Sequence, residues 1–338
     1  MADIICFGEI MLRLAPPEYG RFLQADSFQA VYGGSESNVA VSLSVFGEEA
    51  AFVSKIPEND LGQAAINSLR QYGVDTSRVI RGGKRLGLYF LEKGASQRPS
   101  RVIYDRADSA IAAASAREFQ WAAILKDAKW LHFSGITPAL GRELADACLA
   151  ACKEAKKQGL MISCDLNFRK NLWSREAFAH EMDRLLPFVD VCIANEEDAA
   201  AILKCNGVEI ETSTGDYEKQ EGVAAAFWNR YSFHTLAFTM RRTVSSSDNA
   251  FQAALYDGNS FYYSQIYSMH LVDRVGGGDS FSAGLIYALL HREPCGRAVE
   301  FAVAASCLKH SIEGDVNLAS VQEVLALAEK KGSARVQR

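Results

Sequence analysis

Short apolar segments alternate with helical patterns in the second half of the chain, and this alternation limits the fold more than any other feature. The segments are residues 130–133, 161–164, 191–194 and 235–238. Each has the length of a short buried strand, and a helical pattern separates it from the next. Strands that alternate with helices predict an α/β fold, with a parallel sheet covered on both faces. Ligands of such sheets bind at the carboxyl ends of the strands.

We expect residues 1–338 to form one domain, to which the first half of the chain contributes further strands and helices. Residues 4–7 form an apolar strand, and two β-like segments at about 10–33 and 79–106 contain turn residues. We expect the two β-like segments to pair as a small lid. The other expected elements are a strand at 51–54 and helices at 36–46, 60–72 (capped by Asp60), 279–290, 296–310 and 320–330.

The composition is that of an ordinary globular enzyme, with 49% apolar and 23% charged residues. A formal charge of −5 argues against a protein that binds nucleic acid or a membrane surface. The N-terminal residues predict no signal peptide and no membrane helix. The eight cysteines form no Cys-x-x-Cys motif, so we expect buried, reduced thiols in a cytoplasmic protein. The chain has no P-loop motif, and no dinucleotide-binding glycine motif follows its first strand.

Three consecutive glycines before an apolar helical run suggest an anion-binding site. They are Gly276, Gly277 and Gly278. Glycines at a helix start leave backbone N–H groups bare, and these groups favour an anion together with the helix dipole. Asp279 follows in the same turn, where it would stand as a base beside a bound phosphate. The alternative is a plain glycine-rich turn with Asp279 as the helix cap.

A second glycine motif joins a turn to the expected helix at 36–46. Gly33 and Gly34 would let a ligand approach the backbone closely, and Asn38 is able to orient a hydroxyl group. The alternative is an ordinary helix start with Ser35 as its N-cap.

Arginines and tyrosines follow other strands. Arg169 comes shortly after the strand at 161–164, while Arg106 ends the second lid segment near Tyr89 and Tyr104. Arginine pairs well with carboxylates and phosphates, so the lid would offer a guanidinium and two phenols to an acidic sugar. The alternatives are a solvated Arg169 in a surface turn and a solvated basic edge on the lid.

The sequence from Asp273 to Gly284, Asp-x-x-Gly-x-Gly-Asp-x-Phe-x-x-Gly, resembles the C-terminal signature of the ribokinase-like (PfkB) sugar kinases. The resemblance implies a ribokinase-like fold: a mainly parallel central sheet with helices on both faces, plus a small β lid. It implies that the three glycines form the anion hole and that Asp279 is the catalytic base. The Gly-Gly-x-x-x-Asn-x-Ala motif is similar to the family's N-terminal signature, which implies that Gly34 and Asn38 lie at the sugar site.

One branch of this family, the 2-keto-3-deoxygluconate kinases, is similar over nearly the whole chain. In that branch the Tyr-x-Arg of the lid and the Arg after Asp-x-Asn-x hold the sugar acid. The matching residues are Gly34, Tyr89, Tyr104, Arg106 and Arg169, and residues 309–317 resemble the branch's C-terminal stretch. The resemblance implies ATP-dependent phosphorylation of 2-dehydro-3-deoxy-D-gluconate to its 6-phosphate, with ATP and Mg²⁺.

Acidic residues after the strand at 191–194 resemble the family's Asn-x-x-Glu motif, which serves the magnesium region through water. The fourth position is Asp198, one methylene shorter than Glu, so either Glu197 or Asp198 would take this role. The alternative is an acidic helix N-terminus without any metal. The family places ATP near the end of the strand at 235–238, although a solvated Arg241 is as reasonable there. The expected nucleotide-binding residues are Asn195, Asp198, Arg241, Gly276 and Gly278.

Two other functions fit the same motifs. One is a fructokinase or another neutral-sugar kinase, although Arg106 together with Arg169 suits an acid better than a polyol. The other is a non-catalytic sugar-sensing protein, which the intact Asp279 and its glycines disfavour. Exposed lid edges also predict a homo-oligomer, a dimer or larger.

Overall fold

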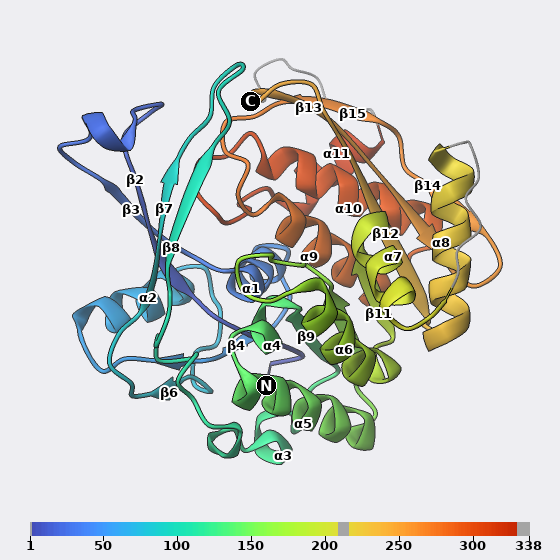
Figure 1. Ribbon diagram of the computed structural model, residues 1–338, viewed down its shortest axis with the longest axis horizontal. Helices are drawn as coiled ribbons and strands as arrows, with labels where there is room; N and C mark the ends of the chain where they lie inside the picture. Colours follow the sequence, from blue (N-terminus) through green and yellow to red (C-terminus); the bar gives the residue numbers. More distant parts are fainter. Residues whose placement is uncertain (1, 209–215, 330–338) are drawn as a thin grey trace.

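The computed structural model describes residues 2–208 and 216–329, and within them nine strands form one large sheet (Figure 1). Its order is β14-β13-β12-β11-β10-β9-β1-β4, with β15 also paired to β13. The six strands from β4 to β12 run parallel, and β13, β14 and β15 are antiparallel additions. The strands are β1 (Ile4–Phe7), β4 (Ala50–Val53), β9 (Trp130–Ser134), β10 (Met161–Asp165), β11 (Val191–Ala194), β12 (Thr235–Thr243), β13 (Asp248–Tyr256), β14 (Phe261–Tyr263) and β15 (Tyr267–His270).

The predicted parallel strands are present, but the antiparallel edge of the sheet was not predicted. β12 continues five residues beyond the expected end at 238, and its last three residues are exposed. This half-exposed extension pairs with β13, whose buried and partly buried residues alternate over much of its length. An apolar run does not mark such strands, because only one of their faces is buried.

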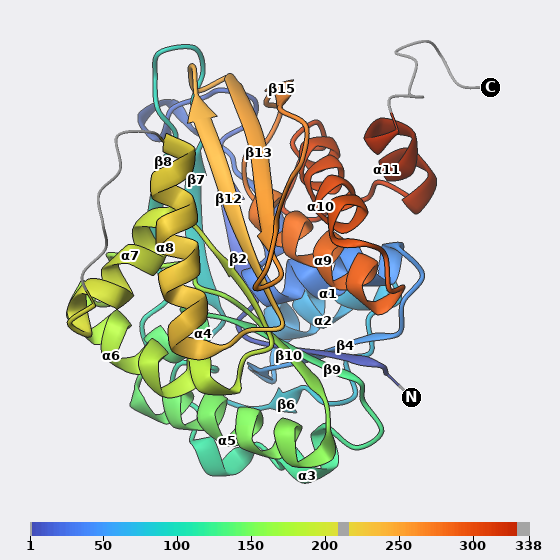
Figure 2. The same ribbon diagram turned by 90° about the vertical axis from the view of Figure 1, so that its right-hand side faces the viewer.

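Helices cover both faces of the sheet, as the alternation predicts (Figure 2). Since neighbouring strand residues point to opposite faces, Ile5 and Phe7 belong to one core while Ile4 and Cys6 belong to the other. The first core includes residues of α3 (Trp121–Ile124), α5 (Arg142–Gln158), α6 (Arg175–Leu185), α7 (Glu196–Cys205) and α8 (Asp216–Tyr231). The second includes residues of α1 (Ser35–Val45), α2 (Asp60–Arg70), α9 (Gly277–Leu290), α10 (Cys295–Lys309) and α11 (Val321–Ala328). The short α4 (Ile136–Ala139) follows β9.

The structure corrects the expected cap of α2 and the expected start of α9. Asn59, not Asp60, is the N-cap of α2, because its side chain accepts a hydrogen bond from the Gly62 N–H at 2.9 Å. Helix α9 begins at Gly277 rather than at 279, so two of the three glycines are helical. For the expected helix at 320–330, Ser320 is the cap of α11 and residue 330 lies outside the described residues.

A second, four-stranded sheet of order β3-β2-β7-β8 stands beside the carboxyl ends of the central strands (Figure 1). Its strands are β2 (Met11–Ala15), β3 (Gln29–Gly33), β7 (Gly87–Glu92) and β8 (Arg101–Asp105). All four lie in the two segments expected to form a lid, and we call this sheet the lid. A separate two-stranded pair joins β5 (Lys55–Ile56) to β6 (Ile80–Arg81).

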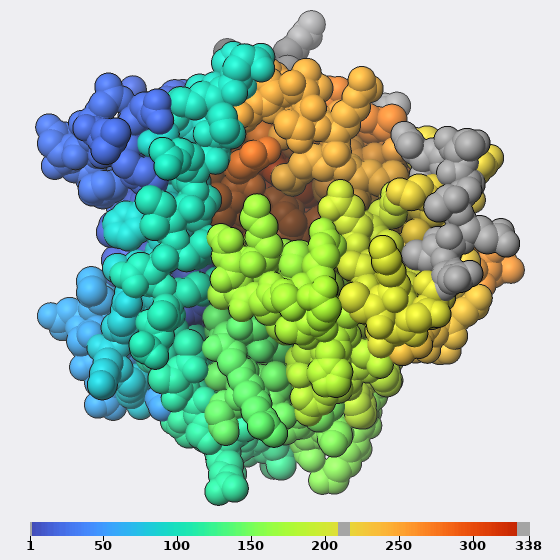
Figure 3. All heavy atoms as spheres, in the orientation of Figure 1, coloured from blue at the N-terminus to red at the C-terminus, as the bar shows by residue number. Residues whose placement is uncertain are grey.

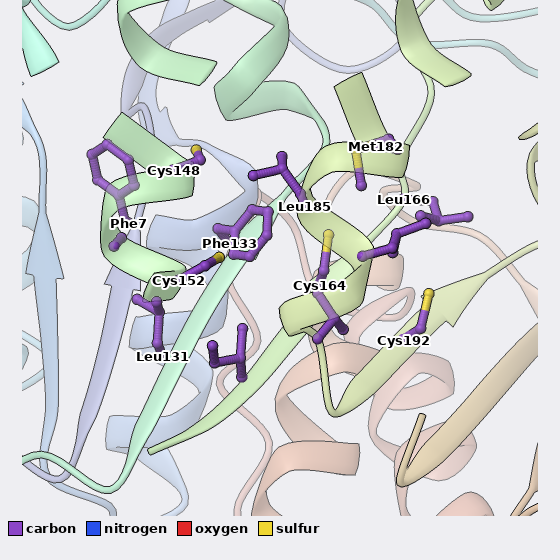
Figure 4. Packing of buried hydrophobic residues seen from close by; sticks show 14 of the residues in the cluster. Phe7, Leu131, Phe133, Cys148, Cys152, Cys164, Leu166, Met182, Leu185 and Cys192 are labelled. Carbon is purple, nitrogen blue, oxygen red and sulfur yellow. The ribbon is translucent and has the colours of Figure 1, made fainter. Parts of the chain in front are cut away.

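Cysteines are part of the apolar core rather than of any cross-link. All eight lie in the described part of the chain, and none is bridged. Cys148 and Cys152 on α5 pack with Phe133, and Cys164 and Cys192 lie on the adjacent strands β10 and β11 (Figure 4). Burial strongly raises the pKa values of these four thiols, so they remain protonated and unreactive. No helix in the described part is both long and apolar enough to cross a membrane.

The close packing of α9 against α10 predicts that Gly→Leu destabilises the protein at Gly284 but not at Gly222, a glycine in a looser helical position. A Cβ on Gly284 would lie 2.9 Å from the Cα of Ala302, whereas a Cβ on Gly222 in α8 would meet nothing within 4 Å. We expect Gly284→Leu to lower the free energy of unfolding by about 2–3 kcal/mol through overpacking. Gly222→Leu should preserve it or raise it by up to about 1 kcal/mol, because Gly is the poorer helix former. Urea denaturation of both variants checks this, and equal losses would contradict the close α9–α10 contact.

Candidate functional site

The lid, the starts of α1 and α9 and the carboxyl ends of the central strands meet around one hollow. Figure 3 shows it between the cyan lid strands and the yellow-green region around α6 and α7, with residues of the C-terminal third at its bottom. Parallel α/β sheets bind ligands at this end. The two glycine motifs, at opposite ends of the sequence, therefore lie at the same place.

Asp279 is held by two side chains from α1. Its Oδ1 accepts a hydrogen bond from the Ser35 hydroxyl at 2.8 Å, and its Oδ2 accepts one from the Asn38 amide at 2.7 Å. Asp279 makes no capping bond, and the N-cap of α9 is Gly276, so the alternative of a helix cap does not describe it. Burial raises the pKa of Asp279, while the bonds from Asn38 and Ser35 oppose the rise. The carboxylate is thus oriented and made more basic.

Ser35 was not identified as a site residue from the sequence. The sequence offered Ser35 as the N-cap of α1. In the structure Gly34 is the N-cap, and no side chain makes a capping hydrogen bond there. Ser35 and Asn38 are three positions apart on one helix, so they share a face. That spacing was the only signal in the sequence for Ser35.

Each glycine of the turn before α9 has a different surrounding. Gly276 has a φ of 81°, and a Cβ there would collide with the Asp315 carbonyl oxygen. A Cβ on Gly277 would collide with the His310 ring, whereas one on Gly278 would meet nothing within 4 Å. The turn is therefore packed on its inner side and open at Gly278, at the N-terminus of a 14-residue helix. Such a terminus favours an anion.

A buried ion cluster joins the lid to this glycine turn. Arg13 on β2 donates to Asp315 and to Asp273, both at 2.6 Å, and the Tyr89 hydroxyl also donates to Asp315. Asp273 in turn accepts the Val275 N–H at 3.2 Å, just before the glycines. The Arg13 side chain is almost fully buried, as are both carboxylates. Breaking such a pair leaves an uncompensated buried charge, which is costly.

The lid brings together the aromatic and basic residues that the sequence indicated. The rings of Tyr89 and Tyr104 are 5.9 Å apart, and the Arg106 guanidinium lies 5.5 Å from the centre of the Tyr104 ring. However, both Nε and Nη2 of Arg106 donate to Glu9, a residue that the sequence did not single out. Arg106 is thus already paired with a carboxylate. A Cβ on Gly34 would collide with the Glu9 carbonyl oxygen, so this turn requires glycine.

Arg169 lies in the loop after β10, exposed and near two carboxylates. Its positive charge opposes the rise in the pKa values of Asp165 and Asp279 that burial causes. Within the described residues it makes no ion pair at contact distance, in contrast to Arg106. Burial, and after it the negative charge of Asp279, raise the pKa of Asp165 to about 7. Arg169 is thus a cation with unused hydrogen-bond donors beside Asp279.

A cleft of about 780 Å³ lies beside this hollow, between α7, α8 and the extended part of β12. Arg241 lines it, its guanidinium 5.7 Å from the Phe251 ring centre and 3.4 Å from His310 Nε2. The surrounding protein, and after it the charge of Arg274, lower the pKa of Arg241. The sequence gave no reason to select Arg274. A guanidinium in the cleft suits a phosphate group.

The acidic residues of α7 divide between the cleft and the protein interior. Asn195 caps α7 by accepting the Asp198 N–H at 2.8 Å, and Asp198 accepts the Asn195 amide at 2.9 Å and the Phe168 N–H at 3.3 Å. Glu197 is exposed on the cleft wall beside Asn195. In residues 2–208 and 216–329 no three His, Cys, Asp or Glu side chains could hold a metal together. Carboxylate oxygens of this kind are ligands that a magnesium ion accepts directly or through water.

Comparisons with known proteins agree with this geometry. Residues 1–321 match the model of the pfkB family carbohydrate kinases. A crystal structure of 2-dehydro-3-deoxygluconokinase from Thermotoga maritima is 45% identical with a TM-score of 0.93, covering 97% of this chain and 100% of that one. A 2-dehydro-3-deoxygalactonokinase from Haloferax volcanii is 33% identical, covering 96% and 95%. A 2-dehydro-3-deoxygluconokinase from Bacillus subtilis is 27% identical, covering 96% and 94%.

The raised pKa of Asp165 predicts a pH dependence of stability in the absence of ligands. The folded carboxyl group holds its proton more tightly than the unfolded one, so stability falls as pH rises from about 4 to about 7. Asp165→Asn removes this ionisation, and it should stabilise the protein at pH 8 by up to about 4 kcal/mol and by less at pH 5. Denaturant titration at both pH values measures the difference. The exposed Asp26→Asn is the control, and an equal effect of Asp165→Asn at both pH values would contradict the prediction.

Proposed function

The chain belongs to the pfkB family of carbohydrate kinases, and we propose that it phosphorylates 2-dehydro-3-deoxy-D-gluconate at its 6-hydroxyl group with ATP. The observation that carries this proposal is the carboxylate of Asp279, oriented by Ser35 and Asn38 beside the open end of the glycine turn. Relatives named for closely related sugar acids support the substrate class.

Asp279 is the proposed general base. Burial makes it a stronger base than an ordinary carboxylate, while Arg169 and two donated hydrogen bonds favour its ionised form. It would accept the proton of the sugar hydroxyl as that oxygen attacks. The backbone N–H groups of Gly276, Gly277 and Gly278 would stabilise the charge on the transferring phosphoryl group.

The cleft between α7, α8 and β12 is the proposed nucleotide site. Arg241 would bind the phosphates, with Asn195 and the glycine turn at the end near the sugar. Magnesium supplies neutralising charge to the phosphates when it is bound. Glu197 from the cleft wall and Asp198 beside Asp165 are the two residues that would reach its water ligands.

The sugar acid would lie under the lid, between α1 and Asp279. Asn38, Gly34, Tyr89 and Tyr104 surround this space, and Arg169 supplies a cation for the carboxylate. Since Glu9 already neutralises Arg106, the role of Arg106 in binding the acid requires its remaining Nη1 or an exchange of partners.

A neutral-sugar kinase of the same family is the second candidate. The pairing of Arg106 with Glu9 favours it. Of the two arginines expected to hold the sugar carboxylate, Arg106 and Arg169, only Arg169 then lacks a carboxylate partner at contact distance within the described residues. A sugar-sensing protein without activity would have no use for an oriented, basic Asp279. For the assembly, β8 exposes Val102, Ile103 and Tyr104 on the lid, which supports a homo-oligomer formed through this sheet.

Replacing Asp279 tests the catalytic step. Asp279→Asn keeps the shape of the side chain and its partners on α1, but it removes the basicity. We expect kcat to fall by roughly 10²–10⁴-fold with little change in sugar binding. A coupled ADP assay measures turnover, and calorimetry measures binding. Near-normal turnover would refute the assignment of Asp279 as the base.

Replacing Arg169 separates the two kinase candidates. A charge-assisted hydrogen bond contributes roughly 1.5–3 kcal/mol, so Arg169→Leu should lower kcat/KM for the sugar acid about 10–150-fold. The loss on a neutral analogue without the carboxylate should be much smaller. Arg106→Leu is harder to interpret, because it also leaves the buried Glu9 carboxylate without its partner. The double variant Arg106→Leu/Glu9→Gln removes both charges. If Arg169→Leu lowers kcat/KM equally for both substrates, Arg169 does not bind the substrate carboxylate. The neutral-sugar kinase then becomes the better candidate.

A further inference from the structure

Lys309, the last residue of α10, buries its whole side chain under the glycine turn. Its ammonium donates to the carbonyl oxygens of Asp273, at 3.4 Å, and Ile312, at 3.1 Å. Its exposed fraction is 0%, and among the described residues no carboxylate lies within ion-pair distance of the nitrogen. Arg13 instead occupies the two nearby carboxylates, Asp273 and Asp315. No step of the proposed phosphoryl transfer uses this lysine.

A buried ammonium in this position is costly for the fold. Burial lowers the pKa of Lys309, while the negative charges of Asp273, Asp315 and Asp279 oppose this effect. Arg13 and Lys309 together balance the two carboxylates of the cluster. A side chain that only filled the space would do so at lower cost if it were apolar, because a charge loses its hydration when it is buried.

Lys309 lies directly behind the glycine turn, close enough for its charge to act on a group bound there. A Cβ on Gly276 would lie 3.3 Å from Lys309 Cε, so the lysine stem passes directly behind the first glycine. The carbonyl that Lys309 binds belongs to Asp273, and the Asp273 carboxylate accepts the Val275 N–H. The lysine thus contacts the turn on the side away from the open Gly278.

We propose that Lys309 is a positioning residue for phosphoryl transfer: its ammonium fixes the backbone before the glycine turn and supplies positive charge behind it. This inference rests on the proposed kinase function. The charge acts on the developing negative charge of the transferring group more than on the bound substrates, because a fixed charge in a dry site is most effective where charge builds up.

Lys309→Met and Lys309→Gln separate the charge from the hydrogen bonds. Met keeps the apolar stem, and Gln keeps an N–H donor without charge. We expect kcat to fall about 10- to 100-fold in both variants, with the KM values for sugar and ATP within about threefold of wild type. Lys129→Met is the matched control, since that ammonium is exposed and pairs with Asp3 on the surface. It should retain wild-type kinetics.

Affinity for a transition-state mimic gives a second readout that a purely structural role would not change. ADP with aluminium fluoride and magnesium should bind both Lys309 variants at least tenfold more weakly, while ADP alone binds as to wild type. In Lys309→Ala, added ammonium chloride should restore part of kcat, because the freed space is lined by two carbonyl oxygens. Tetramethylammonium chloride is too large for that space and should not.

Several outcomes would overturn the proposal. Wild-type kcat in folded Lys309→Met, or full activity in Lys309→Gln, would show that the charge is not needed. A change confined to KM would assign Lys309 to substrate binding, and failure of both variants to fold would assign it to stability alone. Absence of sugar-acid phosphorylation in the wild-type protein would instead refute the proposed function, and that result is visible without any variant.

Discussion

The pairing of Arg13 with Asp273 and Asp315 is the contact on which the rest of the site depends. It joins the lid to the glycine turn across 260 and 302 positions of sequence, and all three side chains are almost fully buried. Two carboxylates buried side by side would repel each other, so the guanidinium between them is what allows both. Through Asp273 the pairing reaches the Val275 amide, and through Asp315 it reaches Tyr89. The pairing therefore connects the lid directly to the turn.

Opposing electrostatic effects set the state of the base within this site. Burial and the nearby carboxylate of Asp315 make Asp279 hold its proton more tightly, whereas Asn38, Ser35 and Arg169 favour the ionised form. For Asp165, burial and the charge of Asp279 raise the pKa to about 7, which favours its protonated form. Burial thus raises the pKa values of both carboxylates in this pocket. A bound cation or sugar acid would change this balance.

The sequence predicted what local pattern controls and missed what depends on distant partners. Apolar runs marked the parallel strands, and glycines marked the turn before α9, because burial and backbone freedom are local properties. Nothing local indicated that Arg13 would meet Asp315, or that Glu9 would take the guanidinium of Arg106. The antiparallel β13–β15 was missed because strands buried on one face carry a weak signal. The roles of the proposed site residues in catalysis and binding remain predictions.

The substrate is the central claim, and wild-type kinetics test it most directly. A coupled ADP assay would compare kcat/KM for 2-dehydro-3-deoxy-D-gluconate with that for fructose under the same magnesium and ATP concentrations. One unpaired arginine beside the base predicts a preference for the acid of at least about 10-fold, and of about 100-fold if Arg106 also contributes. Equal values, or a preference for fructose, would contradict a site built for a sugar acid.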